Sequence, residues 1–100
     1  MGWAAQYMIK LRAGETVQFR PRGNSMTPRI ESGQLCTVEP VKDLSAVEPG
    51  DVLLCRVNGS DYLRLVKAKS GDRVQIGNNH GRVNGWIGLS GVFGRLTKVE

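Results

Sequence analysis

The stretch that decides the fold is EPGDVLLCRVNGSDYLRLVK, residues 48–67. Its first four residues are typical of a turn, and 52–57 is a nearly continuous apolar run of strand length. Asn58 and Gly59 favour a tight hairpin turn, because both adopt positive φ at little cost. Residues 62–67 then return as a second strand. The stretch therefore predicts an antiparallel β-hairpin.

Further strand patterns lie on both sides of this hairpin. They cover residues 16–20, 35–41, 73–76 and 92–99, with turn residues between them. Residues 77–91 are rich in glycine and asparagine, and we predict an irregular segment there. Short strands separated by turns favour a compact coiled sheet or a partly open barrel. The expected fold is mainly β: a small, coiled, mostly antiparallel domain with one short N-terminal helix.

The helix is predicted from apolar residues at helical spacing. These are Trp3, Tyr7 and Leu11, with Met8 and Ile9 widening the same face. Gly14 is a good C-terminal stop for such a helix. We expect residues 1–14 to form an amphipathic helix packed on a β domain of residues 15–100, the two making a single domain. The same apolar face could instead serve as a partner interface.

Size and charge limit the classes of function. One hundred residues are enough for one domain, and no apolar run approaches the roughly 18 residues that span a bilayer. We therefore expect a soluble cytoplasmic protein with no membrane span. The formal net charge of +5 is compatible with nucleic acid or another polyanion as a partner, and equally with a solvated basic surface.

The cysteines and the single histidine do not form a metal motif. Cys36 and Cys55 lie inside strand-like runs, and neither they nor His80 have metal-ligand spacing. We expect buried thiols that act as small apolar groups, with a disulfide between neighbouring strands as the alternative. No metal or cofactor is expected.

The loop Arg22-Gly23-Asn24-Ser25-Met26-Thr27-Pro28 is the most informative chemical feature. Gly23 and Asn24 tolerate unusual backbone angles, and Pro28 restricts the residue before it to extended geometry. Ser25 therefore occupies a sharply shaped loop between two strands. Such a loop can expose a hydroxyl and direct backbone N–H groups of Gly23, Asn24 and Met26 toward an oxyanion. Ser25 is thus the candidate nucleophile.

Several segments resemble one peptidase family in the same order along the chain. The Ser25 loop resembles the G-x-S-M-x-P box of type I signal peptidases and the G-x-S-M box of LexA and UmuD proteins. Weaker similarities follow at 48–54, 62–66, 70–74, 77–79, 85–88 and 92–96. The resemblance covers most of the chain, from about Arg22 to Leu96. It implies a small coiled β domain and a serine that attacks a peptide carbonyl.

The resemblance also implies a lysine base, and the chain departs from the family there. Arg64 stands at the lysine position, counted seven residues back from Gly71. Arginine stays protonated and has no acceptor, so it cannot take a proton from Ser25. Lys67 and His80 are the substitutes, although three residues along a regular strand put Lys67 on the opposite face from Arg64. Catalysis is therefore expected to be impaired or absent, with an active peptidase using His80 or Lys67 as the alternative.

Two further departures from the family's sequence pattern lie in other segments of the chain. Gly33-Gln34 stands where the family usually has glycine-aspartate. Asn84 stands near the place where signal peptidases have a serine or an aspartate. Both departures agree with an impaired or non-catalytic site.

Arginines surround the Ser25 loop and suggest a different class of function. Arg20, Arg22 and Arg29 flank it, and Arg64 should point toward it. Several guanidinium groups together can bind phosphate or carboxylate through paired hydrogen bonds. The alternative is that they are surface arginines paired with Glu15, Glu31 or Asp61. The sequence thus leaves three hypotheses: a peptidase with an atypical base, a peptidase-like domain that binds a peptide or protein, and a polyanion-binding module.

Overall fold

The computed structural model describes residues 3–23, 26 and 29–100. Ser25, the candidate nucleophile, and Asn24 lie outside the described residues. The elements in chain order are α1 (Ala5–Arg12), β1 (Val17–Phe19), β2 (Cys36–Pro40), η1 (Leu44–Ala46), β3 (Val52–Val57), β4 (Ser60–Ser70), β5 (Arg73–Gly77), β6 (Val83–Ile87), η2 (Leu89–Gly91) and β7 (Val92–Val99).

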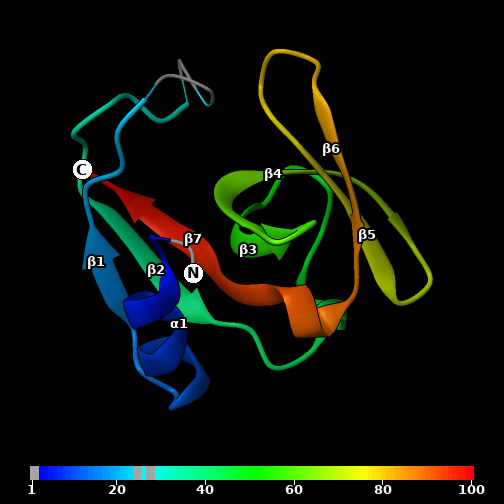
Figure 1. The fold of residues 1–100 in the computed structure, drawn as a ribbon, viewed down its shortest axis with the longest axis horizontal. Helices are drawn as coiled ribbons and strands as arrows, with labels where there is room; N and C mark the ends of the chain where they lie inside the picture. The colour runs from blue at the N-terminus through cyan, green and yellow to red at the C-terminus, as the bar shows by residue number, and fades with distance from the viewer. Residues whose placement is uncertain (1–2, 24–25, 27–28) are drawn as a thin grey trace.

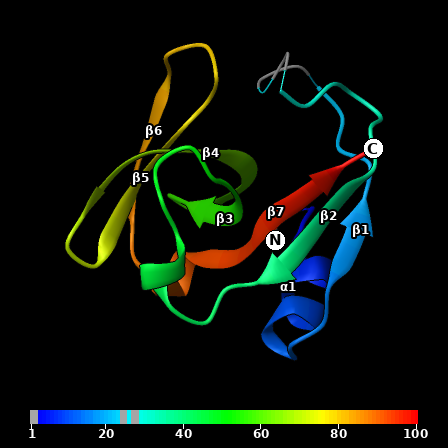
Figure 2. The same cartoon turned by 180° about the vertical axis from the view of Figure 1, so that it is seen from behind.

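The strands form one coiled sheet in the order β1-β2-β7-β3-β4-β5-β6, and every neighbouring pair is antiparallel. Strands β1, β2 and β7 lie on one side of the molecule with α1, and β4, β5 and β6 lie on the other (Figures 1 and 2). The expected fold class, a mostly antiparallel β domain with a short N-terminal helix, is confirmed.

The β3–β4 hairpin lies near the middle of this order and follows the sequence closely. Asn58 and Gly59 have φ of 51° and 82°, and Val57 pairs with Ser60 across the two-residue turn. Positive φ at both turn residues is the geometry that matches the twist of the two strands. The hairpin predicted at this turn is therefore present.

Strand β3 is apolar on both faces because it lies between two cores. Val52 and Leu54 belong to a cluster with residues of α1, β1 and β2, whereas Leu53, Cys55 and Val57 belong to a cluster with residues of η1 and β5. Side chains alternate across a strand, so one continuous apolar run supplies both clusters. Cys36 and Cys55 are buried free thiols, one in each cluster, as the first interpretation of the cysteines expects.

Helix α1 packs on β1, β2 and β7 through Leu11, and Gly14 follows it with φ of 89°. The prediction that Ile9 widens the packed face is wrong, because Ile9 is 67% exposed. Two residues along a helix rotate the side chain by about 200°, which directs Ile9 away from the face of Leu11. No helix in the described part of the chain is long and apolar enough to cross a membrane.

The prediction of an irregular segment at 77–91 is also wrong in part. It contains β6, which pairs with β5, and the short helix η2. Only Ile87 of β6 is buried, Trp86 is 43% exposed and Gly85 has φ of 149°. An edge strand with one buried side chain and a glycine lacks the alternating apolar pattern by which strands are recognised.

Candidate active site

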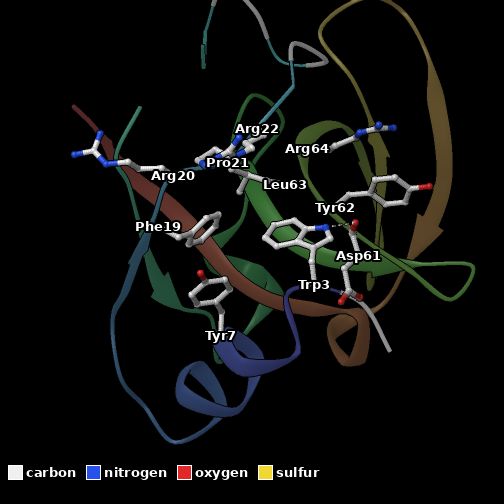
Figure 3. Close-up of a pocket in the computed structure, with 10 residues that line it drawn as sticks. All are labelled: Trp3, Tyr7, Phe19, Arg20, Pro21, Arg22, Asp61, Tyr62, Leu63 and Arg64. Atoms are coloured by element: carbon white, nitrogen blue, oxygen red, sulfur yellow. Dashed lines mark hydrogen bonds between the residues drawn. The ribbon is translucent and has the colours of Figure 1, made fainter. Parts of the chain in front are cut away.

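A groove lies between two segments that are distant in the sequence. Residues 19–22, which continue from β1, form one wall, and residues 61–64 of β4 form the other. Trp3 and Tyr7, from the N-terminal segment and α1, complete the lining of a pocket of about 550 Å³ (Figure 3). The coiling of the sheet brings β1 and β4 to the same pocket although three strands separate them in sheet order.

The edge of β4 that faces this groove follows from the hairpin register. Ser60 closes the two-residue turn, so its backbone groups bond toward Val57, and the pattern then alternates along the strand. Asp61 and Leu63 consequently direct their backbone N–H and C=O groups away from β3. Strand β5 pairs with β4 only from Leu65 onward. The groove is therefore bordered by strand edge at Asp61 and Leu63.

Aromatic side chains form the floor of the groove. Tyr7 stacks on Phe19 with ring centroids 4.6 Å apart, and Trp3 meets Phe19 edge-on at 5.7 Å. The Trp3 Nε1–H donates to the carbonyl of Asp61 at 3.1 Å, which uses one acceptor of the β4 edge. The Trp3 side chain is nevertheless 50% exposed, so much of its ring surface is open to solvent.

Hydrogen bonds hold the described residues of the Ser25 loop beside this groove. Gly23 N–H donates to Ser32 Oγ at 3.2 Å, and Ile30 N–H donates to the Met26 carbonyl at 3.0 Å. Met26 is buried in the same cluster as Leu63, which lines the groove. Gly23 has φ of 104°, a conformation that glycine adopts readily.

Arg64 is held by two contacts on the β6 side of β4. Its Nη1 donates to Asn84 Oδ1 at 2.7 Å, and its guanidinium carbon lies 4.2 Å from the centre of the Tyr62 ring. Figure 3 shows the side chain directed away from Leu63. Tyr62 packs against one core and Leu63 belongs to the other, as alternation along β4 requires. Because Ser25 lies outside the described residues, the expected approach of Arg64 to Ser25 stays a prediction.

Lys67 lies at an irregularity in β4. The register between β4 and β5 shifts between Val66 and Ala68, so Lys67 is the extra residue of a bulge. Its Nζ donates to the Asn78 carbonyl at 3.3 Å, and its aliphatic chain lies over Gly77, where a Cβ atom would be 2.5 Å from Lys67 Cδ. Lys67 is half-buried, and the bulge interrupts the regular alternation of side chains along β4 at this residue.

Asn78 organises the loop that carries His80. Its side-chain oxygen accepts hydrogen bonds from the backbone N–H groups of His80 and Arg82, both at 2.9 Å. Its own carbonyl accepts from Lys67, so the two candidate substitute bases are attached to one residue. Sequence reasoning missed this role, although asparagine in a glycine-rich turn is typical of side-chain hydrogen bonds to nearby backbone groups.

The predicted arginine group does not gather at one point. Arg22 lies at the rim of the groove, Arg20 donates to the Gly33 carbonyl at 2.8 Å, and Arg29 is exposed and outside the pocket lining. In Figure 3, Arg20 and Arg64 point in opposite directions with Arg22 between them. Strand β1 ends at Phe19, so Arg20 and Arg22 follow the strand rather than lie on it.

One of the acids predicted to pair with these arginines has another partner. Asp61 has a fully buried carboxylate that forms an ion pair with Arg56, whose Nε lies 2.7 Å from Asp61 Oδ1. In the part of the chain that the structure describes, no ion pair includes Arg20, Arg22 or Arg64. One sign of this pair is visible in the sequence: Asp61 follows Arg56 by five residues, on the opposite arm of the predicted hairpin.

The chemistry of the described side chains does not favour a metal site. Within residues 3–23, 26 and 29–100, no group of histidine, cysteine, aspartate and glutamate could hold a metal ion.

Comparison with protein families finds a match to the model described as Peptidase S24-like, over residues 3–80. No curated protein matches the chain significantly.

Proposed function

This chain belongs to the peptidase S24-like family, which includes LexA-type, UmuD-type and signal-peptidase-like domains, and we propose that it binds an extended polypeptide without cleaving it by serine–lysine chemistry. The observation that carries the proposal is the position of Arg64, which occupies the lysine position of the resemblance and is held by Asn84 and Tyr62.

Polypeptide binding is supported by the edge of β4. Backbone groups of Asp61 and Leu63 border the groove, and residues 19–22 form its opposite wall. An extended peptide can add to such an edge through main-chain hydrogen bonds and place alternate side chains in the groove. The Trp3 indole already donates to the Asp61 carbonyl, which is the bond a peptide N–H would make there.

Impaired cleavage is supported by the chemistry of the guanidinium. A general base must be unprotonated for part of the time near neutral pH, and an arginine side chain stays protonated. The Arg64 Nη1 donates to the Asn84 amide oxygen, and the guanidinium lies over the Tyr62 ring, so the group acts here as a hydrogen-bond donor and a cation–π partner. Ser25 therefore lacks its usual proton acceptor at residue 64.

The proposal is tested by labelling with a fluorophosphonate probe. We expect the wild-type protein to remain unlabelled at Ser25 over a broad pH range, as judged by intact mass. Ser25→Ala should leave peptide binding unchanged, because the hydroxyl is not used in chemistry. Labelling of wild-type Ser25, lost in Ser25→Ala, would overturn the proposal.

A second candidate function, an active peptidase with Lys67 as the base, is favoured by the bulge in β4. The bulge interrupts the alternation that would put Lys67 on the face opposite Arg64. Lys67→Met should then abolish labelling of Ser25. Lys69→Met is the matched control, since Lys69 is also half-buried on β4 and donates to the backbone carbonyls of Leu44 and Val47. Equal effects of the two variants would exclude a specific role for Lys67.

A further inference from the structure

The groove combines an aromatic floor with a basic rim. The floor is built from Trp3, Tyr7 and Phe19, whose rings contact one another. The rim carries three guanidinium groups, from Arg20, Arg22 and Arg64 (Figure 3). An apolar floor beside separate cationic groups is the surface that an amphipathic anionic ligand would match.

Among the described residues that line the groove, the one carboxylate, that of Asp61, does not neutralise this charge. Asp61 has a side chain with 0% exposure, and both of its oxygens accept from Arg56 at 2.7 and 3.3 Å. Arg56 does not line the pocket. The Asp61 carboxylate therefore has its hydrogen-bond donor outside the groove, and the rim arginines keep a positive potential over the floor.

Arg22 is the rim residue best placed to meet a ligand. It is exposed, lies between the other two arginines in Figure 3, and has no ion pair within the described residues. Arg20 and Arg64 each donate to a protein oxygen, at Gly33 and Asn84. A ligand acid at the groove would therefore meet Arg22 first, with Arg20 and Arg64 at either end.

We propose that the groove selects extended peptide segments in which acidic side chains flank a large apolar or aromatic one. The proposal rests on the peptide-binding function proposed above and names the chemistry of the segment. The apolar side chain packs on the half-exposed Trp3 ring, the backbone pairs with the β4 edge at Leu63, and the flanking acids meet Arg22 and its neighbours.

A peptide fits these observations better than a nucleic acid does. Both ligands could use arginines and a half-exposed tryptophan. Only a peptide can also pair with the strand edge at Leu63, whose N–H and C=O are directed away from β3. The floor is also not an open stacking platform, because Tyr7 and Phe19 already stack on each other.

The test uses three short capped peptides with a central phenylalanine flanked by aspartate, by asparagine or by lysine. Binding is followed by the fluorescence of Trp3 in a Trp86→Phe background, since the chain has two tryptophans. We expect the acidic peptide to bind about three- to tenfold more tightly than the neutral one, and the basic peptide to bind most weakly. Replacing the central phenylalanine with glycine should abolish the fluorescence change.

Two charge-reversal variants separate the groove from general surface charge. Arg22→Glu should reverse the order of the acidic and basic peptides. Arg29→Glu changes the net charge equally but lies outside the pocket lining, and it should preserve the order. Equal effects of both variants would mean that net charge alone attracts the peptide, and the inference would fail.

The remaining outcomes distinguish this inference from the proposed function. If all three peptides bind equally, the groove binds peptides without the selectivity proposed here. If no peptide binds, both the proposed function and the inference fail. If a single-stranded oligonucleotide binds at the groove more tightly than the acidic peptide, with the Trp3 signal lost in Arg22→Glu, the ligand is a nucleic acid and the inference is overturned.

Discussion

Arg64 makes two contacts that depend on the planar guanidinium. One is a hydrogen bond to Asn84 Oδ1 and the other is a face-on approach to the Tyr62 ring. The sequence located this residue at the lysine position by its distance from Gly71, and that remains the reason to expect impaired catalysis. The partners could not be predicted, because Asn84 is twenty residues away on a strand that has no recognisable pattern.

Substituting lysine at this position tests whether the remaining site is competent. An amine can lose its proton when burial disfavours its charge, whereas a guanidinium cannot. We expect Arg64→Lys to gain slow fluorophosphonate labelling of Ser25 that rises with pH, measured by intact mass. Arg64→Met, which fills similar space without an amine, should gain none. A folded Arg64→Lys variant that stays inert would mean that residue 64 does not reach Ser25.

The Cys55 thiol gives a pH-dependent prediction at the same scale. Burial raises its pKa from 9.0 to about 12, although the charge of nearby Arg64 opposes the shift. Between those two values the unfolded chain ionises its thiol while the folded chain does not, so stability is complete below pH 9 and falls as pH rises toward 12. The loss attributable to this thiol is about 1.4 kcal/mol for each pH unit at most.

Comparison with Cys55→Val isolates that contribution. Cys36 remains in both proteins, so its own titration cancels in the difference. We expect the free energy of unfolding, measured in denaturant at pH 8 and pH 10.5, to fall more steeply in wild type than in the variant. Parallel slopes in the two proteins would show that Cys55 ionises as easily in the folded state as in the unfolded state.

At the scale of elements, prediction from sequence succeeded where apolar pattern and turn residues agree. The strands Val52–Val57 and Val92–Val99 were expected with the bounds observed, and β4 runs beyond the 62–67 expected at both ends. The bulge at Lys67 depends on the pairing of β4 with β5, which the local sequence of β4 does not contain. Strand β6 was missed because its pairing with β5, rather than its own side chains, makes it a strand.

Gly94 tests the packing of elements in the sheet. It pairs with Pro40 of β2 and Leu54 of β3, and a Cβ atom there would lie 2.6 Å from Val38 Cγ1 and 2.7 Å from the Glu39 carbonyl. Backbone that close cannot move without shifting the strand. Gly94→Ala should therefore lower the free energy of unfolding by about 1–3 kcal/mol.

Gly88 provides the control for this substitution. Its φ is −94°, and a Cβ atom would meet only the Asp72 carbonyl at 3.8 Å, an ordinary contact. Gly88→Ala should change the free energy of unfolding by less than about 0.5 kcal/mol in either direction. Similar losses from both substitutions in a denaturant titration would contradict the close approach at Gly94.

At the scale of the whole molecule, the groove exists because the sheet coils. Strand β1 and the start of β4 are far apart in sheet order, yet residues 19–22 and 61–64 line one pocket. Strand β3 joins the two cores by supplying alternate side chains to each. The sequence predicted a coiled antiparallel sheet, but the groove itself depends on contacts between segments about forty residues apart, which local patterns do not contain.

The most direct test of the central claim measures binding and cleavage in the same sample. Wild-type protein is equilibrated with a library of short capped peptides, and the peptides retained with the protein are recovered after prolonged incubation and identified by mass spectrometry. We expect retained peptides that are intact and that compete for the Trp3 fluorescence signal. Retained or released fragments that form with wild type and not with Ser25→Ala would contradict the account.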